Sequence, residues 1–162
     1  NTDFGYVIVR QFFFDVYNKL FLNALQQSAD ETLRAFAFKG IKEASYHERF
    51  SGDWLKRLGD GTEQSKKRVQ EAVNDLWVYT DELFQTTTAD DAMIAAGVAP
   101  DMSAFRDTYY EKIKDLLTLA TLDIPEVEYF QKGGKEGLHS EHLGFILTEM
   151  QYMQRTYPDS KW

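Results

Sequence analysis

The residues of this sequence best suited to chemistry are an acid and an imidazole on two successive predicted helices. Asp15 interrupts a run of aromatic residues at positions 12–17, where a carboxylate is costly unless it is paired, hydrogen-bonded or protonated. His47 lies on the apolar stripe of the next predicted helix, so the two side chains could face each other across the core. Helix bundles that activate oxygen use inward carboxylates and a Glu-x-x-His pair, because that spacing places both ligands on one helical face.

The residue three positions before His47 is Ala44, and a methyl group cannot bind a metal ion. Glu43 is one position earlier and is rotated by about 100° around the helix, although a four-residue spacing to His47 still permits a shared site. A metal site usually needs three or more ligands. The pattern therefore favours a buried hydrogen bond between Asp15 and His47 over a surviving metal site.

A second group of polar residues lies in a glycine-rich segment near the end of the chain. The literal Glu-x-x-His at 136–139 falls where helical spacing does not apply. His139 and His142 are three residues apart with Glu141 between them, and could either chelate a metal or bond locally at a helix start. The run at 133–135 resembles part of a phosphate loop, but no strand precedes it, so a structural turn is favoured over an anion contact.

Composition narrows the classes of function further. The sequence contains no cysteine, no Gly-x-Ser-x-Gly elbow and no complete phosphate-binding loop, which excludes thiolate chemistry and disulfides. The net charge of -8, with basic residues interspersed among acids, argues against nucleic acid. No apolar run is long enough to span a bilayer and no leader opens the sequence, so we expect a soluble, cytoplasmic protein that does not bind membranes.

The elements that must position these residues are predicted to be helices. Few prolines and glycines, with 43% hydrophobic residues, indicate one all-α domain over residues 1–162. Residues 4–27 are apolar on nearly every face, which is typical of a central helix. Asp30 should cap a second helix that runs to about Leu58, with a buried stripe at Leu33, Phe36, Gly40, Ala44, His47, Ser51, Trp54 and Leu58.

Further helices follow along the chain. Thr62 should cap a third helix, whose apolar stripe continues from Val69 to Phe84. A short helix is expected over 90–96 and a longer one from Pro100-Asp101 to about Thr121. Residues 122–139 should form an extended connection whose glycines permit positive φ, and Ser140 should cap a last helix. Its predicted stripe is Leu143, Ile146, Leu147, Met150 and Met153.

Two motifs and the end of the chain resemble the PaaC family of phenylacetate-degradation proteins. The first motif is residues 41–50, Ile-Lys-Glu-Ala-Ser-Tyr-His-Glu-Arg-Phe. The second, over 133–144, is more specific because it combines fixed glycines, a lysine and two histidines three residues apart; its members are Gly133, Gly134, Lys135, Gly137, His139 and His142. The closing residues 149–155 and Trp162 are similar as well, and the likeness extends over essentially the whole chain.

The resemblance implies a ferritin-like helical bundle that is a catalytically silent subunit of phenylacetyl-CoA 1,2-epoxidase. Its own iron site would be vestigial, with Asp15 and His47 at ligand positions and Ala44 where the iron-bearing relative has glutamate. On this basis the chain has no catalytic residue, cofactor or metal of its own. The resemblance also implies that a first helical pair precedes Asn1, so that residues 1–162 form the C-terminal two-thirds of the full protein. Without that pair, exposed apolar residues would favour homo-oligomerisation or nicking.

The partners that the resemblance implies are a homologous diiron catalytic subunit and the other epoxidase components, including a flavin and iron–sulfur reductase. Two alternatives remain open from the residues themselves. One is a working diiron-carboxylate oxygenase that uses Asp15, Glu43 and His47 with ligands from other helices. The other is an unrelated all-α adaptor.

Overall fold

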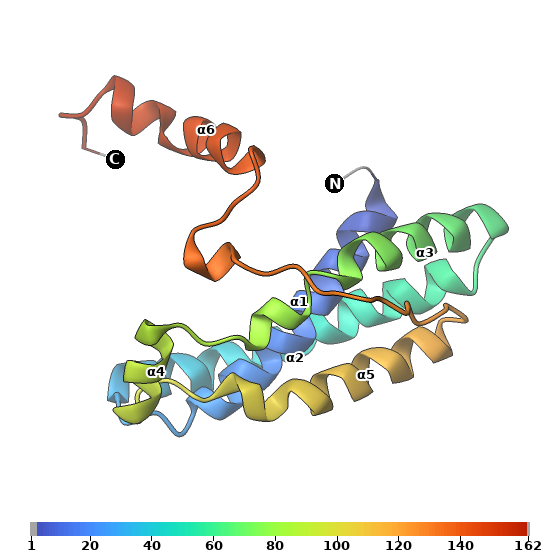
Figure 1. The fold of residues 1–162 in the computed structure, drawn as a ribbon, viewed down its shortest axis with the longest axis horizontal. Helices are drawn as coiled ribbons and strands as arrows, with labels where there is room; N and C mark the ends of the chain where they lie inside the picture. Colours follow the sequence, from blue (N-terminus) through green and yellow to red (C-terminus); the bar gives the residue numbers. More distant parts are fainter. Residues whose placement is uncertain (1–2, 162) are drawn as a thin grey trace. The chain divides into compact units, whose positions relative to one another are not determined.

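The computed structural model describes residues 3–161, and every regular element within that range is helical (Figure 1). The predicted all-α architecture is therefore confirmed, and the packing of long helices side by side is consistent with a ferritin-like bundle. Asn1 and Trp162, to which part of the sequence argument referred, lie outside the described residues. The chain divides into two compact units, Asn1–Gln131 and Lys132–Trp162. A single domain over residues 1–162 stays a prediction.

Helix α1 (Phe4–Leu25) is the central element of the first unit. Asp3 caps it by accepting a hydrogen bond from the backbone N–H of Tyr6 at 2.9 Å. Helices α2, α3 and α5 all contact α1 (Figure 1), so side chains on several of its faces, including Val9 and Val16, are almost completely buried. The prediction of a central helix is confirmed, although Phe14 points out of the core with half of its surface exposed.

The capping residues read from the sequence set the starts of the next two helices. Asp30 accepts from the N–H of Leu33 at 2.9 Å and begins α2 (Glu31–Gly59). Thr62 accepts from the N–H of Ser65 at 3.2 Å and begins α3 (Glu63–Trp77). In both cases a side-chain oxygen satisfies an N–H group that has no partner within the helix.

The predicted buried stripe of α2 is wrong at Phe36, which is 62% exposed, whereas its neighbour Ala37 is fully buried. The helix is rotated so that small residues at seven-residue spacing, Ala37, Ala44 and Ser51, face the core. Small side chains allow two helix backbones to approach closely, which accounts for the seam between α1 and α2. The larger aromatic residues of α2 are left at the surface: Phe36, Phe38, Tyr46 and Phe50.

The region after α3 is less regular than the sequence suggests. The predicted stripe to Phe84 does not form one α-helix, because α3 ends at Trp77 and Asp81–Phe84 is a short 3-10 helix. Helix α4 (Thr88–Ala95) is the expected short helix and starts with a capping box between Thr87 and Asp90. The long helix expected after Pro100 begins as a 3-10 turn, followed by α5 (Arg106–Leu119).

Helices α2 and α5 meet at their C-terminal ends, where the backbones come very close. A Cβ atom added at Gly59 would lie 2.2 Å from the carbonyl oxygen of Ala120. Thr121 has a positive φ of 58° and its hydroxyl donates to the carbonyl of Gly59 at 3.1 Å. Only glycine fits this position, since any side chain would overlap a backbone oxygen.

The second unit contains α6 (His142–Thr156), and the predicted cap for this helix is wrong. The helix begins after Glu141 rather than Ser140, and Glu141 makes no side-chain capping bond. Ser140 instead accepts from the N–H of Leu143 through its backbone carbonyl at 3.1 Å. Throughout residues 3–161, no helix is long and apolar enough to cross a membrane.

The core of the first unit contains one polar atom without a partner. Tyr109 is fully buried, and its hydroxyl makes no hydrogen bond to any described residue. Its ring packs edge-on against Phe84 and Tyr110, and burial raises the pKa of its hydroxyl well above the ordinary value. The neighbouring Tyr110 hydroxyl, in contrast, is 2.9 Å from the hydroxyl of Thr80.

We predict that Gly59→Ala destabilises the chain by about 1–3 kcal/mol, because the new methyl group would displace the Ala120 backbone. Gly52→Ala in the same helix is the control. A Cβ atom there would make ordinary contacts of 3.4 Å with Leu116 and Phe12, and alanine is the better helix former. Urea unfolding of both variants measures the difference, and equal midpoints would contradict the close approach of α2 and α5.

We also predict that Tyr109→Phe leaves stability unchanged or raises it by up to about 1 kcal/mol, because it removes an unpaired buried hydroxyl. Tyr110→Phe is the matched control and should cost about 1 kcal/mol, since Thr80 then loses a buried partner. Thermal unfolding at neutral pH tests both variants. A larger loss for Tyr109→Phe than for Tyr110→Phe would show that the hydroxyl of Tyr109 has a partner.

Candidate functional site

The carboxylate of Asp15 is the only acidic side chain among the buried residues of the described chain, and it is 2% exposed. Both of its oxygens have partners. Gln11, one turn earlier on α1, donates to Oδ1 at 2.7 Å, and the hydroxyl of Ser51 on α2 donates to Oδ2 at 2.7 Å. Two short hydrogen bonds to the carboxylate offset much of the cost of burying it.

The expected hydrogen bond between Asp15 and His47 is wrong: within residues 3–161, none joins them. The side chain of His47 is 45% exposed, and its Nε2 lies 3.9 Å from a carboxylate oxygen of Glu43, one turn earlier on α2. Its backbone carbonyl, rather than its ring, takes part in the network by lying 2.9 Å from the Ser51 hydroxyl. The rotation of α2 that buries Ser51 turns the imidazole outward.

Ala44 lies on the buried face of α2, where an iron-binding relative is expected to have glutamate. It is 2% exposed and belongs to a small apolar cluster with Leu22, Leu25 and Ala37. A carboxylate at this position would replace a methyl group inside that cluster and would have to be desolvated. The surroundings of Ala44 are therefore built for packing.

These residues do not fit a diiron centre. Asp15 is occupied by Gln11 and Ser51, Ala44 has no donor atom, and the His47 ring is directed toward Glu43 at the surface. In the described part of the chain, no three acidic, histidine or cysteine side chains converge as metal ligands. A diiron site needs several carboxylates together with histidine, and the donor set around Asp15 does not supply them.

Sequence reasoning missed the roles of four residues that shape this site. Gln11 could have been found, because it lies four residues before Asp15 on the same helix. The sequence places Ser51 on the buried stripe but does not reveal it as the donor to Asp15. Lys19 and Glu48 form an ion pair between α1 and α2, partly shielded from solvent, with Glu48 only 18% exposed. No local pattern identifies a pair separated by 29 residues.

A groove of about 340 Å³ lies beside this network, where α1, α2 and α5 meet. Phe12 and Val16 of α1 contribute its apolar lining, and charged residues of both signs surround them: Glu48, Arg49, Asp53, Lys56, Lys112 and Asp115. The equal numbers of acids and bases give the groove no net formal charge. The groove therefore lacks the concentrated positive charge that a polyanionic ligand requires.

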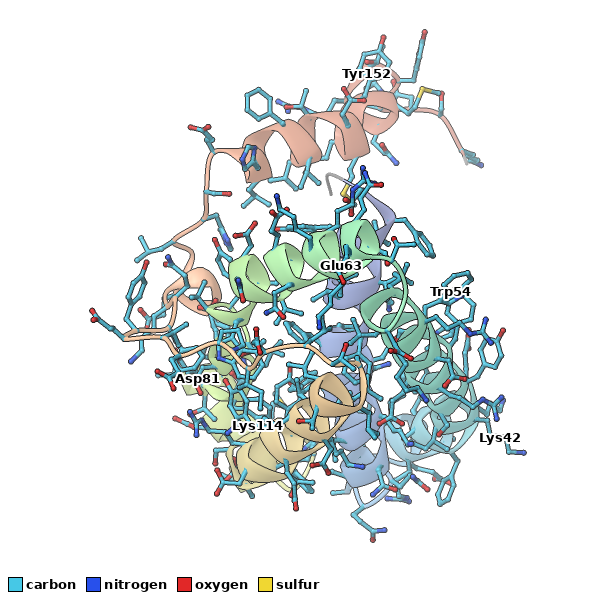
Figure 2. All side chains as sticks on the ribbon, turned by 90° about the vertical axis from the view of Figure 1, so that its right-hand side faces the viewer. Lys42, Trp54, Glu63, Asp81, Lys114 and Tyr152 are labelled. Atoms are coloured by element: carbon cyan, nitrogen blue, oxygen red, sulfur yellow. The ribbon has the colours of Figure 1, made fainter. Side chains whose placement is uncertain are left out.

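Three aromatic residues of α2 follow one another along the helix, of which Tyr46 and Phe50 are exposed and Trp54 is half-buried. The rings of Tyr46, Phe50 and Trp54 follow one another at four-residue spacing, with centroids 6.1 and 6.5 Å apart, and Phe4 of α1 packs edge-on against Trp54 at 5.2 Å. Arg49 lies over the ring of Tyr46 at 5.8 Å. Figure 2 shows Trp54 projecting outward from α2. Such a surface can contact another protein through aromatic and arginine side chains.

The glycine-rich motif of the second unit is a turn. Gly133 and Gly137 have positive φ values of 102° and 88°, and Gly134–Glu136 between them is a short 3-10 helix. The N–H of Leu138 donates to the carbonyl of Gly133 at 2.8 Å, and a Cβ atom at Gly133 would lie 2.8 Å from the Leu138 side chain. The expectation that these glycines permit positive φ is confirmed for Gly133 and Gly137.

The other polar residues of this motif, Lys135, His139 and His142, do not form a ligand-binding group in the described part of the chain. His139 and His142 are exposed, and they belong to no group of three metal-ligating side chains in the described range. Lys135 is also exposed at the surface of the turn. The positive φ angles of Gly133 and Gly137 account for a turn at this position. The sequence favoured such a turn over an anion contact.

We predict that Ser51→Ala destabilises the chain by about 1–3 kcal/mol, because it removes a donor from the buried Asp15 carboxylate. His47→Ala is the control and should change the unfolding free energy by less than about 0.5 kcal/mol, since its side chain is largely at the surface. Urea unfolding compares the two variants. A greater loss for His47→Ala would mean that the imidazole, and not Ser51, stabilises Asp15.

Comparison with known proteins agrees with the motifs. A family model described as "Phenylacetic acid catabolic protein" matches residues 1–162. The chain is 42% identical over 162 residues to one subunit of the 1,2-phenylacetyl-CoA epoxidase of Escherichia coli (strain K12). That alignment covers 100% of this chain and 65% of the relative, so the chain spans about two-thirds of the curated protein that it matches. With the whole sequence matched, the chain belongs to the phenylacetic acid catabolic protein family.

Proposed function

We propose that this chain is a catalytically silent, structural subunit of a phenylacetyl-CoA 1,2-epoxidase, and that it supports a homologous diiron catalytic subunit. The observation that carries the proposal is the apolar packing of Ala44 at the position where an iron-bearing relative is expected to have glutamate. Family membership and the similarity to a known epoxidase subunit support the assignment to this enzyme system.

The environment of Asp15 supports a structural role for the former ligand positions. In an oxygenase, the carboxylates must be free to bind iron, and hydrogen bonds to both oxygens of a buried carboxylate compete with that binding. Gln11 and Ser51 make such bonds, and the bond from Ser51 connects α1 to α2. Asp15 would thus have changed from a metal ligand to a residue that holds two helices together.

The surface of the first unit is suited to holding another helical protein. Phe36 and Phe38 of α2 are exposed in addition to Tyr46 and Phe50, and Arg49 and Arg57 of the same helix place planar cations over the rings of Tyr46 and Trp54. Aromatic and arginine side chains are the residues that most often dominate the binding energy of protein interfaces. A helix-on-helix contact through this face would position the catalytic subunit without placing any reactive group in this chain.

The family resemblance also implies the roles of the other components of the epoxidase system. The partner's diiron centre would insert oxygen into the aromatic ring, and a separate flavin and iron–sulfur reductase would supply electrons. The location of this system would be the cytoplasm. In this arrangement the present chain orients and stabilises its partner, and it contributes no group that exchanges electrons or protons with the substrate.

We predict that the chain, mixed with the diiron subunit and the reductase, is required for full epoxidation of phenylacetyl-CoA but carries no stoichiometric iron itself. Iron analysis of each separated subunit and a product assay with each component omitted measure the two parts. The Ala44→Glu variant should not epoxidise the substrate without the partner, because Asp15 and His47 remain turned away from a shared site.

Different outcomes would identify the alternatives. Near-stoichiometric iron bound by the chain alone, or product formed by the Ala44→Glu variant without its partner, would favour a working oxygenase that uses Asp15, Glu43 and His47. Failure of the chain to co-purify with the diiron subunit would show that it does not support that subunit. Either result would contradict the proposed role.

A further inference from the structure

The outward face of α2 combines positive charge with aromatic rings. Residues three, four and seven positions apart share one face of a helix. An arc of about 100° on α2 contains six exposed side chains, which we call the basic face: Lys39, Lys42, Tyr46, Arg49, Phe50 and Arg57. No other element of Asn1–Gln131 buries them. Figure 2 shows Lys42 projecting from α2 away from the bundle.

The four cations of the basic face lack acidic partners. None of them forms an ion pair within the described chain. The acids that α2 does contain are largely engaged by other bases, since Asp53 pairs with Lys56 at 2.7 Å and Glu48 pairs with Lys19. Residues 31–59 contain six basic and four acidic residues, although the whole chain has a formal charge of -8. Positive charge is therefore concentrated on one helix of an acidic protein.

Aromatic rings hold the two arginines of the basic face in place. The guanidinium carbon of Arg49 lies 5.8 Å from the ring centroid of Tyr46, and that of Arg57 lies 5.6 Å from the ring centroid of Trp54. Cation–π attraction orders a guanidinium group while its five N–H groups can still bind a carboxylate, often in a bidentate manner. The basic face thus presents ordered donors for carboxylates beside exposed rings.

The spacing of these cations suits an extended partner better than a compact anion. From Lys39 to Arg57 the basic face extends for about 27 Å along the helix axis. Small charged ligands bind in concave sites where several polar groups converge, and the cations here are instead distributed along the outside of a helix. A second helix with carboxylates along one side matches both the length and the charge.

Other occupants complement the basic face less well. Residues 132–162 contain four basic and four acidic residues, so this segment has no excess of negative charge to offer. Two copies related by a twofold axis would bring one basic face against the other, and like charges oppose association. An anionic membrane would be repelled by the net charge of -8 on the chain.

From these observations we infer that the basic face of α2 binds an acidic helical surface of the diiron catalytic subunit. This inference rests on the proposed function, and it adds the charge of the surface that the partner must present. Arg49 and Arg57 pair with carboxylates of that surface, and the rings of Tyr46 and Phe50 pack between them. Complementary charge of this kind accelerates encounter and excludes wrong partners.

The experiment measures binding of the purified catalytic subunit to the full chain by titration calorimetry. Arg49→Glu should weaken binding by about tenfold or more, because the new carboxylate would face the acids of the partner. Lys67→Glu makes the same change of charge on α3, where Lys67 is exposed and lies 3.9 Å from Glu71, and it should change affinity by less than about threefold. The gap between the two variants should narrow as NaCl rises from roughly 50 mM to roughly 500 mM, because salt screens exposed charges.

Lys42→Glu is a second variant that does not disturb the arginine–aromatic contacts. Lys42 is exposed and makes no ion pair in the described chain, so its replacement should leave the melting midpoint unchanged. It should still weaken binding more than Lys67→Glu does. A loss of affinity with an unchanged melting midpoint separates a contact with the partner from a role in folding.

The results distinguish this inference from the proposed function. If the unchanged chain does not bind the catalytic subunit, both fail. If it binds, and Arg49→Glu and Lys42→Glu bind as tightly as Lys67→Glu, the proposed function stands and docking through the basic face is wrong.

Three measurements on the chain alone test other occupants of the basic face. A change in sedimentation from dimer to monomer on Arg49→Glu would identify a second copy. Binding to vesicles of phosphatidylserine and phosphatidylcholine that Arg49→Glu abolishes would identify a membrane, and binding of coenzyme A that Arg49→Glu abolishes would identify a compact anion. Each of these results would overturn docking on the acidic partner.

Discussion

A carboxylate buried between two helices constrains this structure more than any other polar group. Asp15 can remain inside the seam between α1 and α2 only if donors reach both of its oxygens, and Ser51 must therefore face α1. Turning Ser51 inward also turns Ala37 and Ala44 inward, since all three share one face of α2. The same rotation directs His47 toward solvent. The hydrogen bond between Ser51 and Asp15 thus goes together with a rotation of α2 that places Ala44 inside and His47 outside.

The helices and most of their ends could be predicted from the sequence, because local chemistry determines them. Asp30 and Thr62 cap their helices as expected, since a short polar side chain at those positions can accept from the first turn. Gly59 ends α2 where Ala120 leaves no room for a side chain. Ser140 failed as a cap because the backbone carbonyl, and not the hydroxyl, bonds to Leu143. The type of a polar residue at a helix start therefore does not by itself show whether its side chain caps the helix.

The site was harder to predict because it depends on how one helix is rotated against another. The periodicity of α2 places Phe36 and Ala37 on adjacent positions, and a difference of about 100° decides which of them is buried. Close packing between α1 and α2 favours the small Ala37 at the buried position, so the ring of Phe36 stays at the surface. The same rotation separates Asp15 from His47. The ion pair between Lys19 and Glu48 depends on the register between helices, which no single segment of sequence contains.

The distribution of polar and apolar groups gives the two units different physical properties. The first unit satisfies its buried carboxylate, encloses its core and carries all of the net charge, so it can fold around its own interior. The second unit has no net formal charge and no buried residue in α6. The glycine turn at 133–137 uses two left-handed residues to change the chain direction before α6 begins. The two units therefore differ in their chemistry: the first carries the net negative charge around an enclosed core, and the second is neutral and contains the glycine turn.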